Sequence, residues 1–216
     1  MVQQEAYNRL RGTLPAGVTL VAVSKTKPVE DIQALYDLGH RDFGENYVQE
    51  LLEKQRLLPG DIRWHFIGHL QSNKVKLLAP FVHLIHGVDG YSLLREIDKQ
   101  GIKAGRRVDC LLQMHIAVEE TKFGLDRDEL GPLLERIEAE PLSHAHVRGL
   151  MGMATNGCDG IQLREEFTGL AELFAMGKER FPDWDTLSMG MSVDYLEAVE
   201  SGSTMVRIGS LLFGTR

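Results

Sequence analysis

Lys25 is the residue of this chain best placed for covalent chemistry. It follows the apolar, β-branched run 18–23, and Pro28 closes the segment, as expected for a buried strand that ends in a loop. At the rim of a core, desolvation lowers the pKa of an amine and frees its lone pair to form a Schiff base with an aldehyde. The plainer interpretation is a lysine with a buried stem and an amine in water. Taken alone, Lys25 favours that second interpretation, because lysine is seldom buried.

Two segments near the end of the chain could bind an anion. Ser188-Met-Gly-Met-Ser192-Val-Asp194 joins a predicted strand to a helix, so Ser192 is either an ordinary N-cap or part of a phosphate site. Val206-Arg-Ile-Gly-Ser210 ends the next predicted strand, and Gly209 would let a ligand approach the backbone closely. The loops after strands seven and eight are a frequent phosphate site in (β/α)₈ enzymes. With Lys25 on the neighbouring strand, they predict a site for an aldehyde that carries a phosphate.

Strand and helix signals alternate along the chain. The strand signals are 18–24, 41–46, 63–68, 82–86, 108–116, 147–153, 186–190 and 205–208. A helical pattern follows each of them except the last, residues 3–11 predict an additional N-terminal helix, and Asp126 with Glu129 predicts a capping box. We therefore predict an α/β fold in which residues 1–216 form a single (β/α)₈ TIM barrel, with a doubly wound open sheet as the alternative. Both architectures place ligands at the carboxyl ends of the strands.

Composition excludes several classes of protein. The 216 residues carry a formal charge of −7 without a long basic run, which argues against nucleic acid as a partner. We expect no membrane segment and no signal peptide, because no apolar stretch is long enough and the N-terminus lacks a basic, apolar leader. Cys110 and Cys158 are too few for a disulfide framework. These features predict a cytoplasmic protein, and we expect a monomer.

The eight histidines raise the question of a metal site. His65 and His69 are four residues apart, but on a strand and its following loop rather than on one helical face. His83 and His86 are three apart in a predicted strand, so we expect them on opposite faces. We therefore predict no metal.

Several motifs carry a resemblance to a known family. The sequence is similar to the pyridoxal 5′-phosphate homeostasis proteins, the stand-alone relatives of the alanine racemase N-terminal barrel. The motifs follow one another over nearly the whole chain: Val21-Ala-Val-Ser-Lys25, Phe43-Gly-Glu-Asn46, Trp64-His-Phe-Ile-Gly68-His-Leu-Gln-Ser-Asn-Lys74, Gly149-Leu-Met-Gly-Met153, Ser188-Met-Gly-Met-Ser192-Val-Asp194 and Gly202-Ser-Thr-Met-Val-Arg-Ile-Gly209.

The resemblance implies a role for individual residues. Lys25 matches the lysine that forms the internal aldimine with pyridoxal phosphate, and Asn46 matches an asparagine beside the cofactor ring. Arg207 matches the arginine that faces the pyridine nitrogen, and His65, within a family motif, is expected to line the pocket. The phosphate would be bound by Met191, Ser192, Ile208, Gly209 and Ser210.

The same resemblance implies a carrier with little or no catalysis. A guanidinium only donates hydrogen bonds, so Arg207 would leave the pyridine nitrogen unprotonated and the ring a weaker electron sink. With the chain ending at Arg216, we expect the β domain of the two-domain racemases to be absent. The family role is pyridoxal phosphate homeostasis, with pyridoxal-phosphate-dependent apoenzymes as expected recipients. A pyridoxal-phosphate-dependent amino-acid racemase and a phosphosugar barrel without cofactor are the alternatives.

Overall fold

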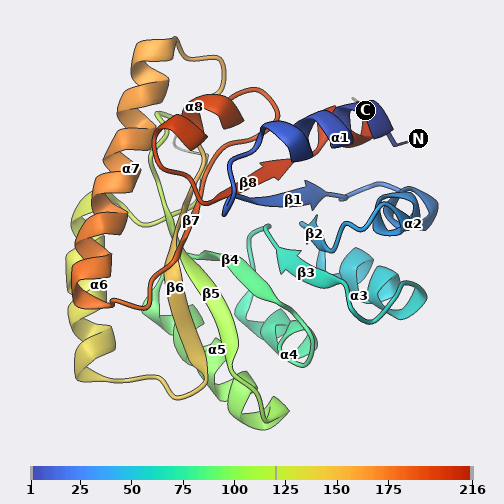
Figure 1. Ribbon diagram of the computed structural model, residues 1–216. Helices are drawn as coiled ribbons and strands as arrows, with labels where there is room; N and C mark the ends of the chain where they lie inside the picture. Colours follow the sequence, from blue (N-terminus) through green and yellow to red (C-terminus); the bar gives the residue numbers. More distant parts are fainter. Residues whose placement is uncertain (1, 120, 215–216) are drawn as a thin grey trace.

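Eight parallel strands close into a barrel in a computed structural model that describes residues 2–119 and 121–214 (Figure 1). Each strand pairs with the next along the chain, and β8 pairs with β1. The strands are β1 Thr19–Val23, β2 Asp42–Glu45, β3 Arg63–Phe66, β4 Leu84–Val88, β5 Val108–Met114, β6 Ala145–Gly152, β7 Thr186–Ser188 and β8 Met205–Ile208.

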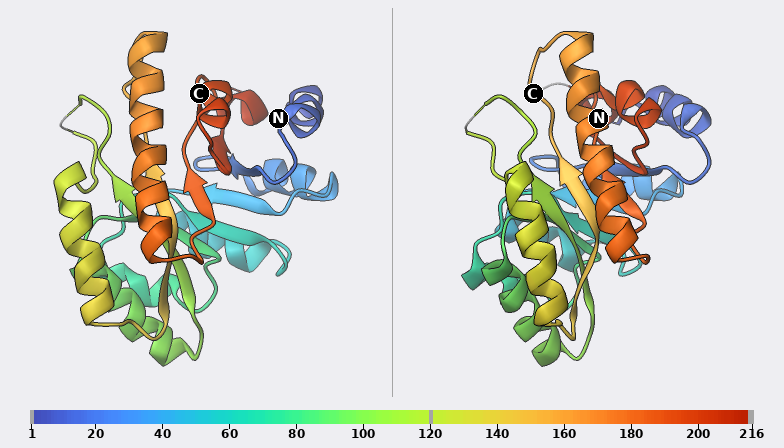
Figure 2. Two further views of the ribbon diagram at one scale, coloured as in Figure 1. Left: turned by 60° about the vertical axis from the view of Figure 1, so that its left-hand side comes forward. Right: turned by 90° about the vertical axis from the view of Figure 1, so that its left-hand side faces the viewer.

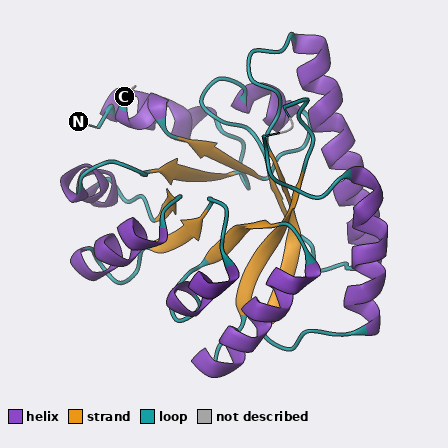
Figure 3. Ribbon diagram, turned by 180° about the vertical axis from the view of Figure 1, so that it is seen from behind, coloured by secondary structure: helices purple, strands orange, loops and turns teal. Residues whose placement is uncertain are grey.

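The helices lie around the outside of the strands (Figure 3). They are α1 Gln4–Thr13, α2 Val29–Asp37, α3 Val48–Leu57, the 3₁₀ helix η1 Ser72–Lys74, α4 Val75–Leu78, α5 Tyr91–Ala104, α6 Arg127–Ala139, α7 Gly160–Arg180, α8 Tyr195–Glu200 and α9 Ser210–Phe213. The longest of them, α7, runs along the outer side of the barrel next to α6 (Figure 2). None of the helices in the described residues is long and apolar enough to cross a membrane.

The pairing of the first strand with the last closes the sheet. Four residue pairs join β1 to β8, from Thr19 opposite Met205 to Ala22 opposite Ile208. The predicted (β/α)₈ barrel is therefore confirmed, and the open-sheet alternative is wrong. Closure places β1, which leads into the loop of Lys25, directly beside β8, which carries the second predicted phosphate segment.

Local sequence signals explain where several elements begin and end. The predicted capping box is present at the start of α6, where the Asp126 amide donates to Oε2 of Glu129 at 2.8 Å. At the end of α5, Gly105 adopts φ 65°, a left-handed conformation that glycine takes without strain. The predicted N-terminal helix is α1, and the Gln3 amide beside it donates to the Leu212 carbonyl at 2.7 Å. Helix α9, which contains Leu212, was not predicted.

Apolar side chains form one cluster inside the barrel and a larger one outside it. The inner cluster takes one buried residue from each of five strands: Val21, Leu84, Leu111, Met151 and Met205. The larger cluster lies between the strands and the surrounding helices. Side chains alternate between these two environments along each strand, which is why the strands read as nearly continuous apolar runs.

Candidate functional site

Lys25 lies in a tight loop at the carboxyl end of β1. The loop starts where the Ser24 amide donates to the Gly44 carbonyl at 3.0 Å, and it turns where the Lys27 amide donates to the Ser24 carbonyl at 3.0 Å. Thr26 has φ 63°, which is uncommon for a β-branched residue and indicates that the surroundings fix this loop. Lys25 itself is half-buried, as expected for an amine at the rim of the barrel.

A buried ion pair behind this loop holds it in place. Nζ of Lys54 on α3 donates to the Ser24 carbonyl at 2.8 Å and pairs with Oε1 of Glu45 at 2.8 Å and of Glu50 at 2.6 Å. The Ser24 hydroxyl donates to the same Glu45 oxygen at 2.6 Å, and the Thr26 amide donates to Glu50 at 2.6 Å. Both Lys54 and Glu45 are buried. This support was not predicted from the sequence, because a lysine in a charged helix gives no sign of burial.

Burial also shifts the ionisation of the carboxylate in this network. Desolvation raises the pKa of Glu45, while the charge and the hydrogen bond of Lys54 act in the opposite direction. Oε2 of Glu45 is buried and makes no hydrogen bond to another described residue. The Glu45 carboxylate therefore depends on Lys54 for its stability as an ion.

The two predicted phosphate segments meet in the structure. Oγ of Ser192 accepts a hydrogen bond from the Gly209 amide at 3.2 Å, which joins the loop after β7 to the loop after β8. The Met191 amide donates to Oδ1 of Asp194 at 2.5 Å, so the turn is already ordered around an anionic group. Ser210 follows as the first residue of α9. Ile208 is fully buried in the outer core, so only its backbone can serve a ligand.

Asn46 lies at the end of β2 in close contact with the next loop. A Cβ added to Gly68 would lie 2.3 Å from the Asn46 carbonyl oxygen, so only glycine fits there. Oδ1 of Asn46 is buried without a hydrogen-bond partner among the described residues. Because an unsatisfied buried amide oxygen is costly, it indicates that a donor from a ligand belongs at this position.

Arg207 lies on β8, and its side chain is buried inside the barrel, where it contacts β7 and β6. Its Nη1 donates to the carbonyl and the hydroxyl of Ser188, at 2.8 and 2.7 Å, and its Nη2 donates to the Gly152 carbonyl at 3.0 Å. These acceptors are neutral oxygens, unlike the salt bridge that would be the ordinary alternative for a buried arginine. Desolvation lowers the pKa of Arg207 to about 10, so the guanidinium stays charged at neutral pH and remains a donor only.

A chain of hydrogen bonds leads from Arg207 through the barrel interior. The Ser188 hydroxyl lies 3.2 Å from Nδ1 of His86, and Nε2 of His86 lies 3.0 Å from Nδ1 of His65. Nε2 of His65 then lies 3.1 Å from Oδ1 of Asp42 at the start of β2. Neutral histidines protonated on Nε2 satisfy every link, with each donor directed toward Asp42. Burial favours this state, because it lowers the pKa of His65 and of His86.

The prediction that His83 and His86 face opposite ways is wrong, and the prediction that His65 contacts a ligand stays open. His83 and His86 do not face opposite ways, because the rings of both lie close to that of His65, with centroids 5.2 and 5.3 Å away. The reason is that β4 begins at Leu84, so His83 precedes the strand and escapes its alternation. Both ring nitrogens of His65 are engaged inside the barrel, and its contact with a ligand stays a prediction.

Comparisons with known proteins show the family of this chain. The profile of the alanine racemase N-terminal domain matches residues 4–216. A pyridoxal phosphate homeostasis protein of Pasteurella multocida is 41% identical over 208 residues, covering 93% of this chain and 88% of that protein. The chain belongs to this family. The homeostasis protein of Escherichia coli K12 is 39% identical over 209 residues, covering 95% of this chain and 88% of its own.

Solved structures of family members and of racemases share the barrel. PipY of Synechococcus elongatus PCC7942, solved without pyridoxal phosphate, is 36% identical, with a TM-score of 0.91 over 97% of this chain and 99% of its own. A second PipY structure, with pyridoxal phosphate bound, has a TM-score of 0.87 over the same shares. Alanine racemase of Clostridium difficile 630 is 12% identical, with a TM-score of 0.82. The match covers 99% of this chain and 56% of the racemase. That last likeness shows the fold alone.

Proposed function

We propose that this chain binds pyridoxal phosphate at the carboxyl ends of its strands and serves in pyridoxal phosphate homeostasis. The observation that carries the proposal is the hydrogen bond between Ser192 and Gly209, because it joins the two loops proposed to bind the phosphate, one strand away from Lys25. The relatives named for pyridoxal phosphate homeostasis and the PipY structure with pyridoxal phosphate bound support it.

In this proposal each residue of the site has a distinct task. Lys25 binds the aldehyde carbon as a Schiff base, and the loop that Lys54 anchors sets the position of its amine. Ser192 and the amides of Gly209 and Ser210 bind the phosphate, with Ile208 contributing backbone. Met191 orders the turn that carries Ser192, because its amide donates to Asp194. The buried amide of Asn46 lies beside the ring, and His65 supports the pocket from the barrel interior.

We infer that the chain does little or no chemistry on amino acids. Arg207 has its donors directed into the barrel and carries its charge at neutral pH, so it would not protonate a pyridine nitrogen. Carbanion formation at an amino-acid α-carbon would therefore be restrained. A racemase is the second candidate, favoured only by the shared barrel of the alanine racemases. Isotope exchange at the α-carbon of a panel of amino acids separates the two, since sustained exchange that Lys25→Ala abolishes would support the racemase.

The visible absorption spectrum with added pyridoxal phosphate tests the binding proposal. We expect a protonated Schiff-base band that Lys25→Ala removes. Lys27→Ala is the matched control, because it removes a neighbouring amine that is already engaged, Nζ of Lys27 donating to the Phe213 carbonyl at 3.1 Å. A band retained in Lys25→Ala would reject Lys25 as the Schiff-base residue. If the parent protein shows neither the band nor binding of pyridoxal phosphate, the alternative of a phosphosugar barrel without cofactor is favoured.

The cellular setting is part of the same proposal. We place the protein in the cytoplasm as a monomer of one domain, with pyridoxal-phosphate-dependent apoenzymes as its recipients. Cys110 is buried, and burial raises the pKa of its thiol, so it suits a reduced compartment in which it acts as core. Recovery of activity by an apoenzyme mixed with the loaded protein tests delivery. Size-exclusion chromatography with light scattering tests the monomer.

A further inference from the structure

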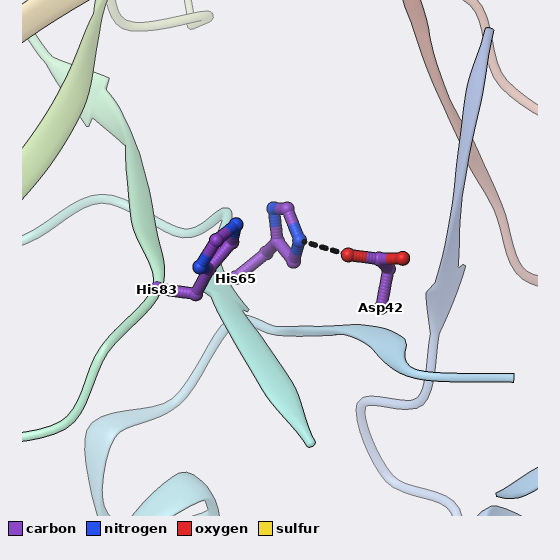
Figure 4. Close-up of side chains that lie close together, drawn as sticks. All are labelled: Asp42, His65 and His83. Carbon is purple, nitrogen blue, oxygen red and sulfur yellow. Dashed lines mark hydrogen bonds and ion pairs between the residues drawn. The ribbon is translucent and has the colours of Figure 1, made fainter. Parts of the chain in front are cut away.

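Three potential metal ligands converge at the amino-terminal end of the barrel, opposite the end that carries Lys25. Asp42 is the first residue of β2, His65 lies on β3, and His83 immediately precedes β4 (Figure 4). One ligand atom from each lies within 4.8 Å of the other two. Asp42 and His65 are buried and His83 is half-buried, so the three ligand atoms form a recessed cluster rather than a solvated surface.

The cluster opens onto a cavity large enough for an ion and its water. The cavity has a volume of about 260 Å³, and Asp42, His65 and His83 all line it. Its other walls include Thr19 and Thr186, the first residues of β1 and β7. The cavity therefore lies at the strand starts, whereas the proposed cofactor site lies at the strand ends.

We propose that Asp42, His65 and His83 bind one divalent transition-metal ion, with Zn²⁺ as the best-fitting probe. Two imidazoles and one carboxylate are a common zinc ligand set, and the fourth position would face the cavity and hold water. Two ligands about 2.1 Å from one tetrahedral ion lie about 3.4 Å apart. Nε2 of His65 and Oδ1 of Asp42 are 3.1 Å apart, so an ion can replace the shared proton with a small adjustment.

Hydrogen bonds and burial set the orientation and the charge of the three proposed ligands. Nε2 of His86 lies 3.0 Å from Nδ1 of His65, and this hydrogen bond fixes the ring. When an ion binds Nε2 of His65, the proton that Nε2 shares with Asp42 without the ion must lie on Nδ1 instead, where it is donated to Nε2 of His86. Burial lowers the pKa of His83 to about 4, so its imidazole is neutral at pH 7. Burial acts to raise the pKa of Asp42, but hydrogen bonds from His65 and Arg63 hold it below its ordinary value. Asp42 is thus ionised and His83 neutral, as a metal requires, whereas His65 has to change tautomer when the ion binds.

Arg63 is the competing cation at this site. Its guanidinium forms a two-bond ion pair with the Asp42 carboxylate, in which Nε donates to Oδ1 at 2.7 Å. The Arg63 side chain is 48% exposed, so it can turn into solvent when an ion binds Oδ1. Arg148 also lines the cavity, but it is paired with Asp109 and Asp185. The proposal thus predicts that removing the charge of Arg63 strengthens metal binding.

Calorimetric titration of the full-length, chelator-treated protein with ZnCl₂ tests the site without pyridoxal phosphate. We expect one ion per chain, an affinity at least about 100-fold lower in His83→Asn, and a higher affinity in Arg63→Gln. His146→Asn is the control, because His146 lies near Asp109 and Asp183 and is the obvious competing zinc site. Its affinity should match that of the parent protein, and circular dichroism verifies that each variant folds.

A second measurement identifies the ligands directly. Co²⁺ in place of Zn²⁺ should give the intense visible bands of a four-coordinate ion, and His83→Asn should lose them. The proposal is overturned if neither the parent nor Arg63→Gln binds zinc stoichiometrically. It is also overturned if His146→Asn loses the ion while His83→Asn keeps it. Because the assay contains no pyridoxal phosphate, neither result bears on the proposed function.

Discussion

Ser192 and Gly209, seventeen residues apart in the chain, are joined by a hydrogen bond of 3.2 Å from the Gly209 amide to the Ser192 hydroxyl. The bond connects the loops that follow two neighbouring strands, so it fixes the spacing of the backbone amides on both sides. A phosphate bound between the loops would take over the Gly209 amide from Ser192, and because the two loops are already held together, little further ordering is needed on binding.

Ser192→Ala should weaken pyridoxal phosphate binding by about tenfold or more, because a hydrogen bond to a charged group contributes about 1.5–3 kcal/mol. The Schiff-base band should still form at saturating ligand, since Lys25 is untouched. Fluorescence titration measures the affinity, with Ser201→Ala, beyond the end of α8, as the matched control. Equal affinities for Ser192→Ala and the parent would leave the Ser192 hydroxyl as a link between the two loops only, since Asp194 rather than Ser192 is the N-cap of α8.

Lys54→Met should destabilise the fold by about 3–5 kcal/mol, because it leaves the Glu45 carboxylate buried without its partner. The additional change Glu45→Gln should restore part of this loss, since no uncompensated charge then remains. Urea denaturation measures both variants, with the exposed Lys76→Met as control. If the double variant is no more stable than the single one, the cost does not come from the buried charge.

The Lys54–Glu45 pair should also affect how fast Lys25, the proposed Schiff-base residue, reacts with pyridoxal phosphate. Because Lys54 holds the Ser24 carbonyl next to Lys25, the double variant should form its Schiff base more slowly even where it folds well. Stopped-flow absorption after mixing with pyridoxal phosphate measures that rate. A rate equal to that of the parent protein would show that the loop keeps its position without Lys54.

The barrel and the meeting of the two proposed phosphate loops were predictable because their signals are local. Apolar runs bounded by turn residues mark the strands, and strand order alone then places the segment around Ser192 beside the one around Gly209. The capping box of Asp126 and Glu129 was likewise visible as a spacing of three residues. Each of these predictions needed only neighbours in the chain and the rule that parallel strands are joined by helices.

The interior polar groups could not be predicted in this way. Asp42 and His65 are 23 residues apart in the chain. They meet because Asp42 starts β2, His65 lies on β3, and these two strands are paired. Spacing rules compare histidines within one element, whereas a barrel brings together residues from successive βα units. His83 adds a second reason, since a shift of two residues in the start of β4 moved it out of the predicted strand.

His40→Gln should flatten the dependence of stability on pH between 6.5 and 4. Desolvation lowers the pKa of the buried His40 from 6.5 to about 4, although its ring donates toward the Asp42 carbonyl at 2.8 Å. The unfolded chain takes up a proton below pH 6.5 and the folded chain does so only near pH 4. Stability contributed by the neutral ring is thus present above pH 6.5 and is lost as the pH falls.

The loss at pH 4 should be about 3 kcal/mol for His40, from a shift of about 2.5 pKa units at about 1.36 kcal/mol each. Urea denaturation at a series of pH values measures it as the difference between His40→Gln and the parent. The other buried histidines are common to both proteins, so the difference isolates His40. Parallel curves for the two proteins would mean that His40 is protonated equally in the folded and unfolded states.

Ser188→Ala tests the hydrogen-bonded chain that runs from Arg207 to Asp42. The hydroxyl of Ser188 accepts from Nη1 of Arg207 at 2.7 Å and lies 3.2 Å from Nδ1 of His86, so its removal leaves two buried groups short of a partner. We expect a loss of about 1–3 kcal/mol of unfolding free energy. Ser188→Thr keeps the hydroxyl and is the matched control.

Nitrogen NMR of the histidine rings provides the more specific readout. In the parent protein His86 and His65 should both carry their proton on Nε2, because that is the one arrangement in which every donor along the chain meets an acceptor. In Ser188→Ala the Nδ1 resonance of His86 should shift as it loses the hydroxyl, while Ser188→Thr preserves it. An unchanged spectrum in Ser188→Ala would place the hydroxyl proton elsewhere and break the link between Arg207 and the histidines.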